Sequence, residues 1–543
     1  MSWPTVRPWI FAGLSGVLLP LCFPHFDLAW LAWVALVPLH LALADLSPRR
    51  ALYLGWAAGL VSSVGIVWWV ITAMHLFGKM PLAPSFAVML LLAGYLGLYV
   101  GLYAAGVVLI QSWYRRWLIL AAPCLWVALE LLRTSFLSGF PWELLGYSQY
   151  RWLTVIQVAD VTAVYGISFV IVMVNVAVAE ITRWALGVSP TPDRTPAPRL
   201  PWAPALAAGL VVAIVLCYGA VRIGQVADAM TGPSLTIGLV QANIDQAHKW
   251  DAAYRRETLD RYERLTKQAA PGSDLIIWPE AATPFLFEQE TPYRAEVNAL
   301  VQSQGIPLLF GSPAIGFYGN GKPYLLNSAY LLSDDARIAG RYDKQHLVPF
   351  GEYIPLKSSV LFFLDKLVEG IGDFEAGTEP TILTIPQKAP PAGGTATEQS
   401  QPGATVTPTA TARFGVAICY EVIFPDLVRR FVDRGADFMV TITNDAWFGE
   451  SSAPYQHFGM MVFRAVENRT AFARAANTGI SGFVDRDGRI LEASPIFEER
   501  TLSRRLTVAK RPTFYSKYGD VFAYGCAIIA AFFTVAAWRR ERN

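Results

Sequence analysis

Two long stretches of this chain contain no charged residue at all. Residues 51–74 and 81–112 lack Asp, Glu, Lys and Arg, and each is longer than the roughly 20 residues that an α-helix needs to cross a bilayer. Buried helices of a large soluble core are the alternative, but stretches of this length without a charge argue against it. We therefore expect membrane-spanning helices.

Similar apolar segments recur over the first 225 residues and again near the C-terminus. Hydrophobic residues make up 54% of the 543 residues and charged residues only 16%, against roughly 25% charged in soluble proteins. Eight membrane helices are predicted, within residues 8–25, 28–44, 51–74, 81–112, 117–132, 161–179, 203–221 and 521–538.

Positive charges are distributed unequally among the loops between these segments, and the cytoplasmic side of a membrane protein is enriched in Lys and Arg. With the N-terminus inside, the outer loops hold little beyond Lys79, Arg133 and Arg151. The inner side receives Arg7, Arg49, Arg50, Arg115, Arg116, Arg183, Arg194, Arg199, Arg539, Arg540 and Arg542. The prediction is a seven-helix membrane domain over 1–225, an extracytoplasmic domain over 226–515, and a C-terminal helix with a cytoplasmic tail over 516–543.

The region between about 233 and 511 alternates β-rich runs with charged, helix-like stretches, which favours an α/β domain with helices covering its sheets. Within it, residues 387–412 are rich in Ala, Pro, Gly and Thr and predict a disordered, solvated insertion. Strands are predicted at 235–240, 274–278, 307–310, 413–418 and 437–442, and helices at 251–269, 422–434 and 456–475.

Cys419 is the only cysteine of this α/β region, since Cys22, Cys124, Cys217 and Cys526 lie in membrane segments. It therefore has no partner for a disulfide within the domain. A small buried residue at a strand end is one interpretation. The other is a nucleophile at a strand-to-helix turn, where backbone N–H groups favour a thiolate and an oxyanion.

A nucleophilic thiol needs a base and a group that stabilises negative charge. Glu280 follows the apolar run Leu275–Ile277 and a proline that ends strand pairing. Lys344 ends another strand-like run. Either residue alone is more typical of an ordinary solvated side chain, but the combination with Cys419 indicates a catalytic site.

The motifs around these residues resemble the Glu, Lys and Cys signature of the nitrilase superfamily. Fused to the predicted membrane helices, they are similar to the bacterial apolipoprotein N-acyltransferase family over essentially the entire chain. The motifs are Trp278-Pro279-Glu280, Asp343-Lys344, Phe350-Gly351-Glu352, Ile418-Cys419-Tyr420-Glu421, Asn444-Asp445-Ala446-Trp447-Phe448-Gly449 and Arg474-Ala475-Ala476-Asn477-Thr478-Gly479.

The resemblance implies a four-layer αββα sandwich and a thioester mechanism without a cofactor or metal. Cys419 would be the nucleophile, Glu280 the general base, and Lys344 the group that stabilises the oxyanion. Glu352 would orient Lys344 or share the proton transfer.

Three further residues receive supporting roles. Tyr420 and Glu421 are expected to shape the pocket rather than react. By resemblance, Trp250 would line the path by which lipid reaches the site, although an exposed tryptophan near a membrane is equally typical of an interfacial anchor.

The same resemblance implies the substrates and the place of action. A phospholipid, in this family usually phosphatidylethanolamine, would donate an acyl chain to the α-amine of the N-terminal diacylglyceryl-cysteine of apolipoproteins. The chain would lie in the bacterial inner membrane among membrane lipids, with its catalytic domain in the periplasm. Nucleic acid is not expected as a partner, because 44 Lys and Arg against 42 Asp and Glu leave a net charge of +2.

Two alternative functions remain open from the sequence. A membrane-tethered amidase would use the same three residues with water as the acceptor. A transporter with an appended domain is disfavoured, because its path would hold several ionisable groups and these membrane segments hold few, Glu130 and Arg133 near one end being exceptions. Gly97 and Gly101 indicate helix packing rather than a pore.

Overall fold

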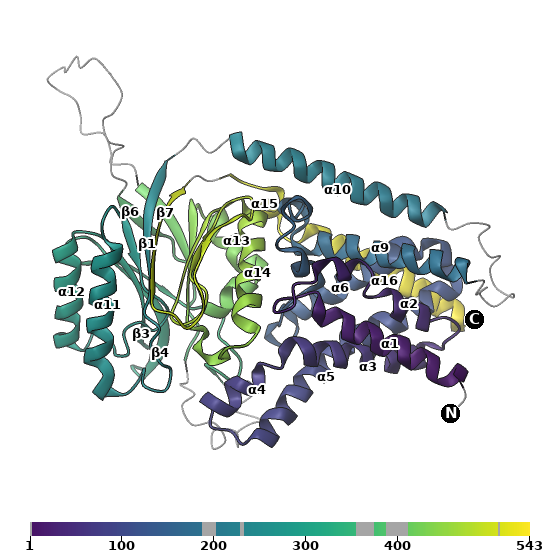
Figure 1. Cartoon of the computed structure of the whole chain (residues 1–543), viewed down its shortest axis with the longest axis horizontal. Helices are drawn as coiled ribbons and strands as arrows, with labels where there is room; N and C mark the ends of the chain where they lie inside the picture. The colour runs from purple at the N-terminus through teal and green to yellow at the C-terminus, as the bar shows by residue number, and fades with distance from the viewer. Residues whose placement is uncertain are drawn as a thin grey trace, which may run out of the picture.

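The computed structural model describes residues 3–186, 202–228, 233–353, 374–386, 411–508 and 511–542. Described residues up to 228 and from 514 onward form a bundle of helices, here called the helical part. Residues 233–508 hold all the strands and are called the α/β part (Figure 1). This arrangement confirms the predicted fold class of a helical membrane part with an α/β part.

The helical part contains long helices joined by short turns. Its elements are α1 Trp3–Leu21, η1 Ala29–Trp33, α2 Val37–Ala42, α3 Pro48–Val67, α4 Val70–Thr72, η2 Ala73–Phe77, α5 Leu82–Tyr114, η3 Arg115–Trp117, α6 Leu118–Ser135, η4 Phe136–Ser138, η5 Leu145–Gln149, α7 Leu153–Ile156, α8 Ala159–Thr162, α9 Val164–Ala185, α10 Trp202–Asp228, α15 Phe514–Tyr518 and α16 Val521–Arg542.

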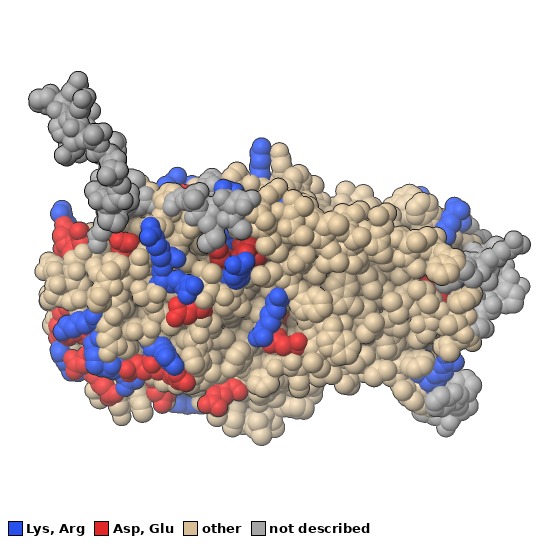
Figure 2. All heavy atoms as spheres, turned by 45° about the horizontal axis from the view of Figure 1, so that its top comes forward, with Lys and Arg blue, Asp and Glu red and all other residues tan. Residues whose placement is uncertain are grey.

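Within the described residues, five segments are helical, long and apolar enough to cross a membrane. They are Pro48–Val67, Leu82–Ser138, Val164–Ala185, Trp202–Val226 and Val521–Arg542. The second of these contains both α5 and α6. Most charged side chains on the face drawn in Figure 2 lie over the α/β part, and the surface of the helices shows few until its far end. The chain is a membrane protein.

The predicted helix over residues 28–44 is not continuous. The segment folds as η1 and α2 instead, because Pro38 lacks the N–H that would continue a helix. Asn175 of α9 satisfies backbone groups left free by the break: its Oδ1 accepts from Leu36 N at 2.8 Å, and its Nδ2 donates to Ala32 O at 2.8 Å. Broken helices persist at membrane depth only with such partners.

Helices α3 and α5 pack closely through glycines, as the sequence predicts for Gly97 and Gly101. A Cβ atom on Gly59 would lie 2.8 Å from Gly97 Cα, and one on Gly101 would lie 2.9 Å from Leu52 O. Larger residues would separate the two backbones, so these positions serve helix packing.

Two six-stranded sheets form the centre of the α/β part, in the orders β12-β1-β2-β3-β4-β5 and β11-β10-β9-β8-β7-β6. Helices α11 and α12 cover one outer side, while α13 and α14 cover the side that faces the helical part (Figure 1). The elements are β1 Ser234–Gln241, η6 Ala252–Tyr254, α11 Arg255–Ala269, β2 Leu275–Ile277, α12 Thr291–Gln304, β3 Leu308–Phe317, β4 Pro323–Leu332, β5 Ile338–Asp343, β6 Leu383–Pro386, β7 Thr411–Ile418, η8 Cys419–Ile423, α13 Pro425–Asp433, β8 Phe438–Thr443, η9 Asp445–Phe448, α14 Ala453–Asn468, β9 Phe472–Ala476, β10 Gly482–Val484, β11 Ile490–Ala493 and β12 Arg500–Thr507.

All five predicted strands are present, but two predicted limits are wrong. The helix expected over 456–475 ends at Asn468, where Arg469 adopts a left-handed φ of 50°, and residues 472–476 form β9. The insertion predicted over 387–412 lies outside the described residues up to 410, while Thr411 and Ala412 already pair with β6. The limits expected at 225 and 515 both fall within helices, α10 and α15, and the division into domains stays a prediction.

Buried polar contacts join the two parts of the molecule. Asp160 of α8 pairs with Arg469 after α14 at 2.9 Å. Trp142 Nε1 donates to Gln456 Oε1 of α14 at 2.8 Å. Since buried polar groups fit only with matched partners, these contacts fix how the α/β part sits on the helices.

Candidate active site

Glu280 lies just beyond the end of β2, as its position in the sequence predicts. Gly311 of β3 permits this turn, because a Cβ atom there would lie 2.6 Å from Glu280 Cα. The carboxylate is 7% exposed and is held from two sides. Its Oε1 accepts from Asn327 Nδ2 at 2.8 Å, and its Oε2 accepts from Asn444 N at 2.9 Å.

Lys344 follows β5 directly and lies between two carboxylates. Its Nζ is 3.5 Å from Glu280 Oε1 and 2.9 Å from Glu352 Oε2. Burial lowers the pKa of Lys344, but the charges of Glu352 and Glu280 outweigh it and raise the pKa above its usual value. Asn327 Nδ2 also donates to Glu352 Oε1 at 2.7 Å, so one amide bridges both acids. Lys344 is therefore a fixed cation at this site.

Cys419 lies at the end of β7 and begins the 3₁₀ turn η8 rather than an α-helix. Its φ of 53° is left-handed, which costs an L-residue roughly 1–2 kcal/mol. Burial and the charge of Glu280 raise the pKa of the thiol, against the opposite effect of Lys344. The expected thiolate is thus not favoured: the resting thiol is neutral, and it needs a base when it attacks.

Glu421 links the strand end that carries Cys419 to the one that carries Lys344. Its Oε2 accepts from Ile418 N at 2.7 Å. Its Oε1 accepts from Tyr342 Oη at 2.7 Å, from Gln345 N at 2.7 Å and from His346 N at 3.1 Å. Glu421 holds backbone rather than the surface of a pocket, and we assign it a positioning role.

We expect this position of Glu421 to make the reaction at Cys419 sensitive to acid. Burial raises the pKa of Glu421 to about 7, although its hydrogen bonds act in the opposite direction. Protonation below that pH turns one acceptor oxygen into a donor facing an N–H group. We expect the rate of Cys419 acylation to fall below about pH 7, and Glu421→Gln to be at least about tenfold slower at all pH values, without this acid limb.

The control for this prediction is Tyr342→Phe, which removes one donor to Glu421 and keeps the carboxylate. Loss of that donor raises the pKa of Glu421, so the acid limb should move to higher pH. Rates of acyl-enzyme formation between pH 5 and 9 measure both effects. An unchanged acid limb in Glu421→Gln would show that another group titrates.

A buried cluster on the far side of Cys419 holds its backbone. His457 Nε2 is 3.1 Å from Cys419 O, and its Nδ1 is 3.0 Å from Asp445 Oδ1 and from Arg474 Nη2. Arg474 Nη2 donates to Asp445 Oδ2 at 2.7 Å. Burial and the charge of Arg474 lower the pKa of His457. A proton on Nε2 lets the ring donate to the Cys419 carbonyl. This contact supports the left-handed turn at Cys419.

Sequence reasoning missed several residues of this site. Asn327 lies in the middle of β4, and His457 lies in α14. Lys249 is buried and donates from Nζ to Glu280 O at 3.1 Å, and burial lowers its pKa to about 8. Lys249 could have been noticed, since it precedes Trp250 in the sequence. Among the described residues, no group of three His, Cys, Asp or Glu could hold a metal ion.

The remaining two predicted residues differ in their surroundings. Tyr420 is buried, and its hydroxyl donates to Gly139 O of the helical part at 3.2 Å. Its ring lies 6.5 Å from that of Phe140. The expected role of Tyr420 in shaping the pocket stays a prediction. Trp250 is 49% exposed, and its expected role at the lipid path stays a prediction.

Two facing sheets with Glu280, Lys344 and Cys419 at their strand ends define a carbon-nitrogen hydrolase fold. The model of the carbon-nitrogen hydrolase family matches residues 236–511. Among solved structures, a variant of an amidase of the nitrilase superfamily from Nesterenkonia is similar, with 20% identity and a TM-score of 0.34, over 53% of this chain and 94% of that one.

Within that fold, the chain belongs to the apolipoprotein N-acyltransferase family. The model of the apolipoprotein N-acyltransferase N-terminal domain matches residues 15–177. An apolipoprotein N-acyltransferase from Geobacter metallireducens is 41% identical over 98% of this chain and 96% of its own length. One from Pasteurella multocida is 30% identical over 96% and 93%. The chain is an enzyme, and its membership covers both of its parts.

Proposed function

We propose that this enzyme transfers an acyl chain from a phospholipid to the α-amine of the N-terminal diacylglyceryl-cysteine of apolipoproteins, through a thioester on Cys419. The observation that carries the proposal is the cluster of Glu280, Lys344 and Cys419 on an α/β part that is joined to apolar helices. Acyl chains lose about 0.8 kcal/mol per CH₂ in water, so a site beside the bilayer suits both lipid substrates.

In the first half-reaction, Cys419 Sγ attacks the ester carbonyl carbon while Glu280 takes the thiol proton. Lys344 stabilises the oxyanion. The C–O bond then breaks, and Glu280 returns the proton to the leaving alkoxide of the lysophospholipid. In the second half-reaction, the α-amine attacks the thioester and gives its proton to Glu280. The C–S bond breaks, Cys419 regains a proton, and an amide has formed.

Mass spectrometry of the purified chain after incubation with phosphatidylethanolamine tests the first step. We expect one acyl mass on the peptide that contains Cys419, and its disappearance when a diacylglyceryl-cysteine peptide is added, with the acyl chain recovered as an amide. Release of free fatty acid instead would indicate the amidase-like reaction with water. No acyl mass on Cys419 with any phospholipid would contradict the mechanism.

We also propose that the α/β part lies on the periplasmic side of the bacterial inner membrane. Arg115 pairs with Glu180 at 2.9 Å, and the Arg540 guanidinium lies 5.0 Å from the ring centre of Tyr114. The basic loop after α5 and the basic C-terminal tail therefore share one end of the helices, which is typical of the cytoplasmic side.

Reporters of topology test this orientation. A fusion after Arg222 should report the periplasm, and a fusion at Asn543 should report the cytoplasm, because seven crossings precede the first and eight precede the second in the predicted arrangement. Equal localisation of the two reporters would show that one predicted span does not cross.

A further inference from the structure

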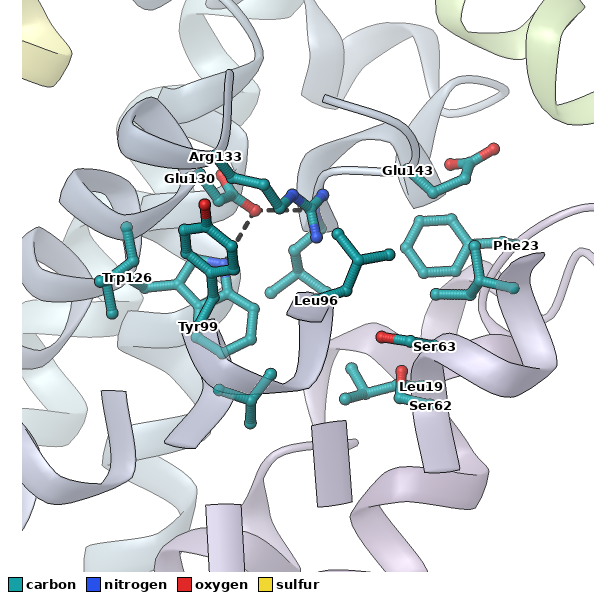
Figure 3. A pocket seen from close by; sticks show the side chains of 14 residues that line it. Leu19, Phe23, Ser62, Ser63, Leu96, Tyr99, Trp126, Glu130, Arg133 and Glu143 are labelled. Atoms are coloured by element: carbon teal, nitrogen blue, oxygen red, sulfur yellow. Dashed lines mark hydrogen bonds between the residues drawn. The ribbon is translucent and has the colours of Figure 1, made fainter. Parts of the chain in front are cut away.

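A pocket opens inside the helical part, next to the α/β part (Figure 3). Apolar side chains of α1, α3, α5 and α6 form most of its wall. Three ionisable residues also line it: Glu130 and Arg133 from the end of α6, and Glu143 from the loop that follows.

Arg133 interacts electrostatically with both Glu130 and Glu143, but two of these groups lack a close ion-pair partner. Among the residues that the structure describes, neither Arg133 nor Glu143 forms an ion pair. Arg133 Nη2 donates to Trp142 O at 3.0 Å, but Arg133 Nε has no hydrogen-bond partner, and neither has Glu143 Oε2. Glu143 is only 4% exposed. Ionisable groups buried within membrane helices are costly and mark functional sites.

The arrangement in Figure 3 suggests how an occupant would lie. The Arg133 side chain reaches into the pocket, with Glu130 on one side and Glu143 on the other. Glu130 is engaged through one oxygen: its Oε1 accepts from Trp126 Nε1 and from Leu145 N, each at 2.8 Å, while its Oε2 has no hydrogen-bond partner. Arg133 and Glu143 therefore bring one cation and one acidic group, neither of them in a close ion pair, to a pocket with mostly apolar walls.

The same loop also touches the catalytic site from its other side. Gly139 O accepts from Tyr420, next to Cys419. The ring of Trp142 lies 5.7 Å from that of His457, the residue that contacts Cys419 O. The loop 139–143 thus contributes Glu143 to the pocket and also contacts two residues beside the nucleophile.

We propose that this pocket binds the zwitterionic head of the phospholipid donor, with the phosphodiester on Arg133 and the primary ammonium on Glu143. Guanidinium groups bind phosphate through charge-assisted hydrogen bonds, and a buried carboxylate is stabilised by an ammonium. The inference rests on the proposed function and assigns the residues that select the donor. Burial and the charge of Asp27 raise the pKa of Glu143 well above its usual value, and a bound ammonium reverses this effect.

Kinetics of Cys419 acylation with three donors test the assignment in the full-length chain. Phosphatidylethanolamine offers both charges, phosphatidylglycerol lacks the ammonium, and phosphatidylcholine has an ammonium that cannot donate a hydrogen bond. We expect Glu143→Gln to raise the half-saturating concentration of phosphatidylethanolamine at least about tenfold and to leave that of phosphatidylglycerol unchanged. Arg133→Gln should raise all three values. The maximal rate of acylation should stay close to that of the unmodified chain.

Arg116→Gln is the matched control, because Arg116 of η3 is an exposed arginine of the helical part and does not line the pocket. Its kinetics should equal those of the unmodified chain. Should the buried substitutions prevent folding, the unmodified chain alone supplies the test. Glycerophosphoethanolamine, which carries no acyl chain, should compete with the lipid donor more strongly than glycerophosphoglycerol.

Three outcomes would overturn the assignment. One is an unchanged ratio of the half-saturating concentrations of phosphatidylethanolamine and phosphatidylglycerol in Glu143→Gln. That result would show that the pocket holds water alone. Another is a defect of Glu143→Gln that is confined to transfer from preformed acyl-enzyme to the diacylglyceryl-cysteine peptide. That result would show that Glu143 binds the ammonium of the acceptor and not that of the donor. The third is equally strong competition by glycerophosphoethanolamine and glycerophosphoglycerol. Failure of the proposed function is distinct from all three, since then no phospholipid acylates Cys419 even in the unmodified chain.

Discussion

Replacement of Cys419 by serine is expected to abolish acyl-enzyme formation, with a loss of at least about 10³-fold in rate. The structure gives the reason. Glu280 can accept a proton from a buried thiol, but a serine hydroxyl is far less acidic and a weaker nucleophile in the same position. Mass spectrometry after incubation with phospholipid measures the loss directly, and gel filtration in detergent checks that the variant is folded.

Cys217→Ser is the control, because it makes the same chemical change at an exposed thiol of α10. It should acylate at the rate of the unmodified chain. Turnover by Cys419→Ser within tenfold of that rate would exclude Cys419 as the nucleophile, and would leave it as the small buried residue of the alternative interpretation.

The places of the three proposed catalytic residues in the fold were predictable because each follows a strand. Glu280, Lys344 and Cys419 lie at the ends of β2, β5 and β7, so a local pattern of strand followed by polar residue was enough to find them. Whether they meet depends on which sheet edges face each other. That information resides in long-range packing, and only the resemblance to a family supplied it before the structure did.

Residues that act through other residues were much harder to predict. Asn327 bridges Glu280 and Glu352 from the middle of a strand, and His457 reaches the Cys419 carbonyl from a helix. Neither position has a local pattern, because a polar residue in the middle of a strand or helix is usually only a satisfied side chain. Their partners are 25 to 47 residues away in the chain.

Apolar length alone also misjudged the helix over 28–44. Hydropathy measures whether a segment can be buried, but Pro38 and the distant Asn175 decide whether it is continuous. The 456–475 segment shows the same limit. Residues 472–476 are as buried as the helix before them, and burial by itself does not distinguish a helix from a strand.

Glu280→Gln and Lys344→Met should each slow acylation at least about a hundredfold, but for different reasons. Without Glu280, the thiol has no base. The loss of its negative charge also lowers the pKa of Cys419, since that charge helps to raise it. Acylation by Glu280→Gln should therefore rise about tenfold per pH unit, as the thiolate fraction does below its pKa, while the unmodified chain shows a weaker dependence at alkaline pH.

Lys344→Met should behave differently, because the missing group stabilises the oxyanion rather than moving a proton. Its defect should be similar for a phospholipid and for a p-nitrophenyl ester, whereas the defect of Glu280→Gln should shrink on the latter, since a phenolate leaves without a proton. In Lys344→Met, the buried carboxylates of Glu280 and Glu352 lose their cation. The double variant Lys344→Met with Glu352→Gln removes one of these unpaired charges and therefore serves as the folding control. Normal acylation kinetics in either single variant would remove that residue from the mechanism. If Glu280→Gln and Lys344→Met showed the same rate defect on the phospholipid and on the p-nitrophenyl ester, Glu280 would act through its charge on Lys344 and not as a base.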